Sequence, residues 1–165
     1  MSKSPSSRRC SVVTVAPYRP WVYALRLPHD PRAAHVARVT VRAVLRSHGR
    51  EEVLDAVELL VSELVSNAYL HTEGPASLRL TGLADGRLRV GVWDSDPRIP
   101  APFGDPPGER RVSSVPGDAE HGRGLLLVRE YANAWGGCPL GDGLLGRGSG
   151  KLLWFEVGAH GPRRG

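Results

Sequence analysis

Residues 63–71 read Glu-Leu-Val-Ser-Asn-Ala-Tyr-Leu-His and lie near the end of a helical pattern that begins around Glu51. Glu63, Asn67 and His71 are spaced four residues apart, so on a helix they line one face, one above the other. The aliphatic residues beside them, among them Leu60 and Leu64, belong to the buried side. A solvated polar face of an amphipathic helix is the simplest interpretation of such a stripe. The alternative is a binding site, and the rest of the chain decides between the two.

The chain of 165 residues, 41% of them hydrophobic, is long enough for one compact domain with its own core. Residues 1–19, rich in Ser, Arg and Pro, are predicted to be a flexible basic arm. Residues 20–158 form the predicted domain, and residues 159–165 a flexible tail.

The net charge of +5 lies mostly at the two ends of the chain. Residues 1–19 carry four basic residues and no acid, and Arg163 and Arg164 add two more. The body therefore has a net charge of −1, which argues against a groove for duplex DNA. A nucleic-acid binder is accordingly the least favoured functional class, and no direct nucleic-acid partner is expected.

Cys10 and Cys138 are too few for a disulfide framework, which fits a reducing compartment. No apolar run approaches the length of a membrane span, and the run 11–16 is too short for a secretory signal. We expect a cytoplasmic protein with no membrane partner.

The order of expected elements is strand, helix, helix, and then a hairpin. The strand covers residues 21–27, and the helices cover 30–48, with Asp30 as N-cap, and 51–71. The hairpin strands span 76–83 and 87–93 around Asp85 and Gly86. A third helix is expected at 121–135, followed by strands at 137–140 and 151–157.

Residues 95–120 contain six prolines and little periodicity. A segment of this length without its own secondary structure is usually functional or disordered. Candidate binding residues flank it on both sides, so we interpret it as a mobile lid.

Two further blocks accompany the helical stripe, in a fixed order. Asp94-x-Asp96-Pro97 follows a predicted strand, and Gly122-x-Gly124-Leu125 opens the third helix. Glycines at a helix start allow close backbone approach, and the free N–H groups there favour a phosphate, although alone they equally mark a plain loop-to-helix turn.

Together the three blocks resemble the N, G1 and G2 boxes of the GHKL ATPases. The small size resembles the bacterial anti-sigma-factor serine/threonine kinases, whose stand-alone actinobacterial relatives also match the closing segment from Gly150 to Glu156. The resemblance covers about residues 20–158. It implies an α+β fold, a Bergerat-type two-layer α/β sandwich with a mixed sheet, helices on one face and a long ATP lid.

The resemblance also assigns roles to matching positions on the helical stripe. Glu63 would be the general base that accepts a proton from an attacking hydroxyl. Asn67 would bind Mg²⁺ through its amide oxygen, a hard ligand that suits a metal bridging phosphates. His71 matches the family pattern, and a capping or packing role is preferred for it.

The other two blocks would hold the nucleotide. Asp94 would accept a hydrogen bond from the adenine amino group. Asp96 stands where relatives often carry Gly or Ser, so a second acid lies near the nucleotide. The backbone from Gly122 to Leu125, including Gly124, would approach the phosphates of ATP, with Arg123 as a charge partner.

Two functional hypotheses follow from the resemblance. The first is a serine/threonine kinase that phosphorylates an anti-sigma-factor antagonist and binds a sigma factor, with ATP and Mg²⁺ as cofactors. The second is a non-catalytic switch in which ATP closes the lid and exposes or hides a partner surface. The sequence leaves open the identity of the partner and whether the chain forms a homodimer.

Overall fold

The structure is a computed structural model that describes residues 19–104, 123–141 and 149–158. Its elements follow the order β1 (Trp21–Leu27), α1 (Ala33–Ser47), η1 (Glu51–Val53), α2 (Leu54–His71), β2 (Ala76–Gly82), β3 (Leu88–Asp94), α3 (Arg123–Leu126), α4 (Val128–Tyr131), β4 (Ala134–Leu140) and β5 (Gly150–Val157). The arm, the tail, most of the predicted lid and Gly122 lie outside the described residues.

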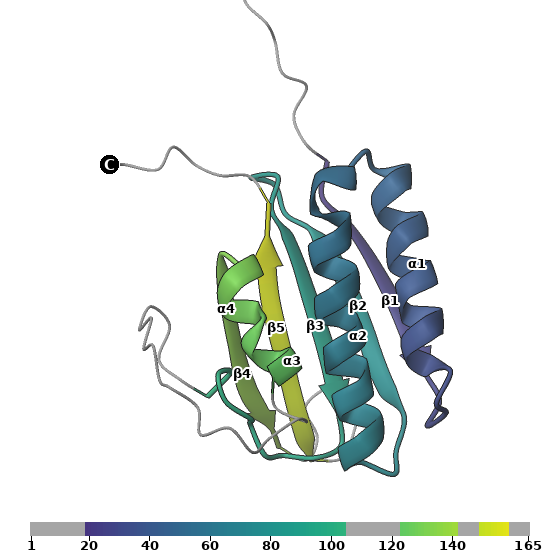
Figure 1. Cartoon of the computed structure of the whole chain (residues 1–165), viewed down its shortest axis with the longest axis vertical. Helices are drawn as coiled ribbons and strands as arrows, with labels where there is room; N and C mark the ends of the chain where they lie inside the picture. The colour runs from purple at the N-terminus through teal and green to yellow at the C-terminus, as the bar shows by residue number, and fades with distance from the viewer. Residues whose placement is uncertain (1–18, 105–122, 142–148, 159–165) are drawn as a thin grey trace, which may run out of the picture.

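One sheet of five strands, in the order β1-β2-β3-β5-β4, carries all the helices on one face (Figure 1). The predicted two-layer α+β architecture is confirmed. The sheet was expected to be mixed, but all four strand pairs are antiparallel. The reason is the position of β5, which lies between β3 and β4 and runs opposite to both.

The core lies between the sheet and the helices, and strand periodicity determines which residues enter it. Alternate residues of β3 are buried from Leu88 through Val92, and those of β5 from Leu153 through Val157. Opposite them, α2 buries Leu60, Val61, Leu64, Val65 and Ala68. Because side chains alternate along a strand, the same inward rows end in Asp94 on β3 and Lys151 on β5.

The first strand has the predicted bounds, whereas the first two helices begin later than expected. The carboxylate of Asp30 accepts a hydrogen bond from the Arg32 N–H at 2.7 Å, so it closes a turn before α1 rather than capping the helix. Residues 51–53 form a 3₁₀ turn, and α2 itself starts at Leu54.

The helix expected at 121–135 does not continue over that whole range. The described part contains two short helices, α3 and α4, and Trp135 lies on β4. Trp135 pairs with Phe155 across the sheet, and its indole N–H donates to the carbonyl of Pro102 at 3.3 Å. These long-range contacts hold the segment as a strand, which its local sequence pattern did not indicate.

Candidate functional site

The three polar residues of the α2 stripe, Glu63, Asn67 and His71, lie in two different places. Asn67 and His71 line a pocket of about 210 Å³ whose other walls come from the segment after β3 and from β5, namely Asp96, Arg98, Ile99, Pro100 and Lys151. The structure therefore brings Asn67 together with Asp96, and it also places His71, for which a capping or packing role was preferred, on the wall of the same pocket.

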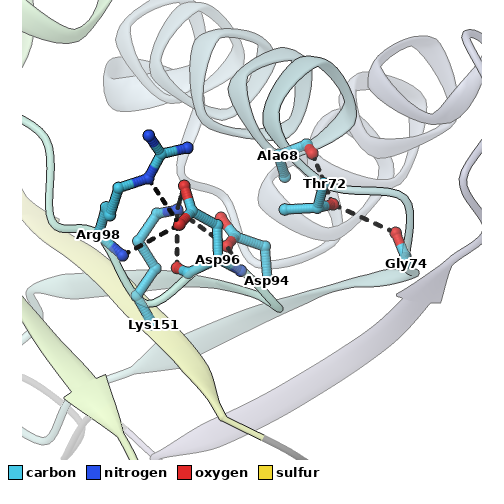
Figure 2. A network of polar contacts seen from close by, with 7 residues as sticks. All are labelled: Ala68, Thr72, Gly74, Asp94, Asp96, Arg98 and Lys151. Carbon is cyan, nitrogen blue, oxygen red and sulfur yellow. Dashed lines mark hydrogen bonds and ion pairs between the residues drawn. The ribbon is translucent and has the colours of Figure 1, made fainter.

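The α2 helix ends beside the segment that follows β3. Thr72 closes the helix, because its hydroxyl donates to the carbonyl of Ala68 at 2.8 Å (Figure 2). The following turn lies close to β3, so that a methyl group at Gly74 would be 3.1 Å from the hydroxyl of Ser95. The end of α2 and the end of β3 are thus held together, which positions His71 near the residues that follow Asp94.

Glu63 lies one helical turn earlier, against α3 rather than in the pocket of Asn67. Its neighbours are the glycine of α3 and a set of apolar residues, which are Leu60, Leu64, Phe103, Leu125, Val128 and Phe155. A methyl group at Gly124 would lie only 1.7 Å from Glu63 Oε2. Because Gly124 has no side chain, the carboxylate of Glu63 can occupy the space where a Cβ atom would otherwise lie.

Asp94, the predicted adenine-binding residue, is buried and paired with Lys151. The Nζ atom of Lys151 lies 2.9 Å from Asp94 Oδ1, and both side chains are almost completely buried. The same Nζ donates to the backbone carbonyl of Asp96 at 3.0 Å and lies 3.4 Å from Asp96 Oδ2 (Figure 2). The backbone N–H of Asp96 also donates to Asp94 Oδ1, at 2.9 Å.

Opposing influences set the charge state of the two acids. Burial raises the pKa of Asp94 above its usual value, although the hydrogen bond and charge of Lys151 act in the other direction. Burial also acts to raise the pKa of Asp96, but hydrogen bonds from Arg98 and the charge of Lys151 outweigh it, and the net shift is downward. Arg98 reaches Asp96 through its Nε at 3.1 Å.

The remaining predicted site residues are at the start of α3. Leu125 is 7% exposed and packs in the hydrophobic core, while Gly124 lies against Glu63 as described. The backbone of Arg123 begins α3, but its side chain, like Gly122, lies outside what the structure describes.

Sequence analysis did not identify Lys151 and Arg98 as site residues. A signal for Lys151 was present, because it occupies an inward position of an otherwise apolar strand, where an unpaired charge would be costly. Arg98 carried no comparable signal, since its role depends on the turn after Asp96.

The described residues contain no helix that is both long and apolar enough to cross a membrane.

Comparison with known proteins gives two matches. An uncharacterized protein of Streptomyces coelicolor is 44% identical over 68 residues, which cover 41% of this chain and 57% of the relative. The match thus spans little more than half the length of that relative.

Residues 27–135 match the sequence profile of the histidine kinase-like ATPase domain, which is more than half of the chain. The matched range includes α2, Asp94 and the start of α3, the three places where the predicted site residues lie. The chain therefore belongs to the histidine kinase-like ATPase domain family, whose members bind ATP.

Proposed function

We propose that this protein is a regulatory serine/threonine kinase that transfers a phosphoryl group from ATP to an anti-sigma-factor antagonist and also binds a sigma factor. The observation that carries the proposal is the pair of Glu63 and Asn67, one turn apart on α2 and adjoining both Gly124 and the pocket beside Asp94. An acid and an amide in this arrangement supply a proton acceptor and a metal ligand.

The residues present fit a magnesium-bound nucleotide. Asp94 is a buried acceptor suited to an exocyclic amino group, and the amide of Asn67 is a hard oxygen donor on the pocket wall. The pocket is smaller than most ligand sites, so a whole nucleotide would have to extend beyond it. When bound, Mg-ATP supplies the transferable phosphoryl group and the cation that neutralises its charge.

Each residue then has a distinct task. Asp94 would orient the base, Asn67 would hold the metal, and the backbone at Gly124 would approach the phosphates. Glu63 accepts the proton of the attacking hydroxyl on the protein substrate.

Phosphate transfer from radiolabelled Mg-ATP to candidate antagonist proteins tests the proposal. Glu63→Ala is expected to reduce transfer by about 10²- to 10⁴-fold, the range for a lost general base, while Mg-ATP binding measured by calorimetry stays largely intact. Asp55→Ala removes an exposed acid near the start of the same helix and serves as the control. Wild-type protein that binds ATP but transfers no phosphate would exclude the kinase.

The position of Glu63 also favours a second function, a non-catalytic switch. Its carboxylate lies against Gly124 rather than in the pocket with Asn67, so it would couple α2 to α3 without performing chemistry. A switch predicts that ATP changes the affinity for a partner protein and that the change persists in Glu63→Ala. Pull-down with and without Mg-ATP distinguishes the two, because partner binding that is indifferent to nucleotide counts against the switch.

A further inference from the structure

Lys151 is a buried cation with most of its hydrogen-bonding capacity directed at the predicted base site. It is 1% exposed, and three oxygen atoms surround its Nζ: Asp94 Oδ1, the backbone carbonyl of Asp96 and Asp96 Oδ2. An ammonium group has three N–H donors, and these three oxygens match them in number. Two of these contacts are hydrogen bonds and the third is an ion pair at 3.4 Å, so most of the donor capacity of Lys151 is used within the protein.

We propose that Lys151 is a positioning residue for the nucleobase, which holds the carboxylate of Asp94 ionised and oriented so that it accepts a hydrogen bond from the amino group of adenine. The proposal rests on the ATP-binding function proposed above and explains how its base site works. Lys151 acts through Asp94, and its side chain also lines the adjoining pocket.

The need for such a residue follows from the two acids. Asp94 and Asp96 are two residues apart, and Asp94 is held in a buried place where a bare negative charge is strongly disfavoured. Without a cation, the site would take up a proton, and a protonated carboxyl donates a hydrogen bond where adenine also donates. Lys151 balances the charge from the side of β5, across the register that pairs it with Asp94.

The same contact accounts for the acid at position 96. The carboxylate of Asp96 forms ion pairs with Lys151 and with Arg98. Its negative charge is therefore compensated within the protein. Asn67 and His71 of α2 line the pocket that Asp96, Arg98 and Lys151 also line, and His71 is the residue that α2 adds to it with an ionisable side chain.

A purely structural ion pair is the competing explanation, and the two differ in their pH dependence. If Lys151 only stabilises the fold, its removal weakens nucleotide binding equally at all pH values. If it keeps Asp94 ionised, its removal raises the pKa of Asp94 further, and binding of adenine nucleotide is then lost progressively as the pH falls.

The test measures dissociation constants of Mg-ATP and Mg-ITP by calorimetry at pH 6 and pH 8 for wild type and Lys151→Met. Methionine keeps much of the length of the side chain and removes its charge. In the variant, the ratio of the ATP dissociation constants at pH 6 and pH 8 should exceed that of wild type by at least about twofold, the ratio reached when half of the Asp94 carboxyl is protonated at pH 6. Because His71 lines the same pocket as Lys151, the comparison is repeated in a His71→Gln background, which removes any contribution of the imidazole.

ITP adds a readout that a structural role would not change. Its base has a carbonyl group where adenine has the amino group, so it is favoured by a protonated Asp94 and disfavoured by an ionised one. Lys151→Met should therefore discriminate less between ATP and ITP at pH 6 than wild type does. An unchanged pH ratio together with unchanged discrimination would overturn the proposal.

A second pair of variants covers the case in which Lys151→Met does not fold. In Asp94→Asn the carboxylate is already neutral, so the additional change Lys151→Met should alter ATP affinity by less than about twofold if Lys151 acts through the charge of Asp94. A further loss of about tenfold in the double variant would refute this. If the wild-type chain itself does not bind Mg-ATP, the proposed function fails before any variant is compared, which separates the two outcomes.

Discussion

Gly150 on β5 lies against the backbone at the end of β3, and its replacement by alanine tests how tightly the base site is packed. A methyl group there would lie 2.1 Å from the carbonyl oxygen of Asp94 and 3.2 Å from the Cα of Ser95. Both atoms belong to the backbone, so a rotamer change cannot relieve the overlap. The two strands must move apart at the place where Lys151 meets Asp94.

The expected size of this effect follows from the cost of overpacking. Forcing extra volume into a packed site typically costs about 1–3 kcal/mol, which for a chain of this size lowers Tm by roughly 3–10 °C. Gly91→Ala is a matched control on the neighbouring strand, because its methyl group would meet Leu152 Cδ1, a flexible side-chain end, at 3.3 Å. It should change Tm by less than about 2 °C.

Thermal unfolding by circular dichroism and Mg-ATP binding by calorimetry provide the measurements. We expect Gly150→Ala to lose both stability and ATP affinity, and Gly91→Ala to keep both. Equal Tm values for the two variants would refute the steric reasoning. A destabilised Gly150→Ala with unchanged ATP affinity would refute the location of the base at Asp94.

Three further predictions concern single contacts. Alanine normally favours a helix over glycine, but at position 124 its methyl group meets the carboxylate of Glu63, so Gly124→Ala should lower the free energy of unfolding in denaturant by about 1–2 kcal/mol. Adding Glu63→Ala to this variant should remove the penalty, because the clashing carboxylate is gone. Glu156 is 2% exposed and pairs with two partly exposed arginines, so Glu156→Ala should lower the free energy of unfolding in urea by about 1–3 kcal/mol, whereas no measurable change would contradict the pairing. The pKa of the Asp96 carboxyl is lower in the folded protein than in the unfolded chain. Its stabilising effect is therefore complete above the unfolded pKa and is lost as the pH falls through the folded pKa. The difference in unfolding free energy between wild type and Asp96→Asn should be constant above about pH 5 and shrink below pH 4.

The sequence predicted those parts of the fold that local periodicity controls. The first strand and the β2–β3 hairpin appear where expected, and the long helix with its polar stripe ends at His71 as predicted although it starts three residues late, because side-chain period and turn residues reveal these elements directly. The late start of α1 and the short α3 and α4 were predicted less well. In those places a turn at Asp30 and the packing of Trp135 on β4 override the local pattern.

The candidate site shows the same division. Asn67 and Asp96 were expected in one site and line one pocket, whereas His71, for which a capping or packing role was preferred, lines the same pocket. The turn at Gly74, which leads from α2 into β2, approaches Ser95 after β3. The pairing of Asp94 with Lys151 joins residues 57 positions apart and depends on the register of β3 with β5. No local pattern contains that register, so the inward position of Lys151 was visible in the sequence but its partner was not.

The two neighbourhoods on α2 lead to a final prediction about parts of the nucleotide. Glu63 and His71 are eight residues apart, or about 12 Å along the helix axis, with Gly124 beside the first and the pocket of Asp96 beside the second. In the proposed function the base lies at the pocket end and the phosphates extend toward α3. Adenosine, which has no phosphate, should then depend on the pocket end alone.

Competition calorimetry with adenosine and ATP measures this separation. Gly150→Ala disturbs the pocket end and should weaken both ligands by a similar factor. Gly124→Ala displaces the carboxylate of Glu63 beside α3, so it should weaken ATP while leaving adenosine within about twofold of wild type. If Gly124→Ala weakens adenosine as much as ATP, the two ends of α2 act as one unit, and the division of the site into a base end and a phosphate end is wrong.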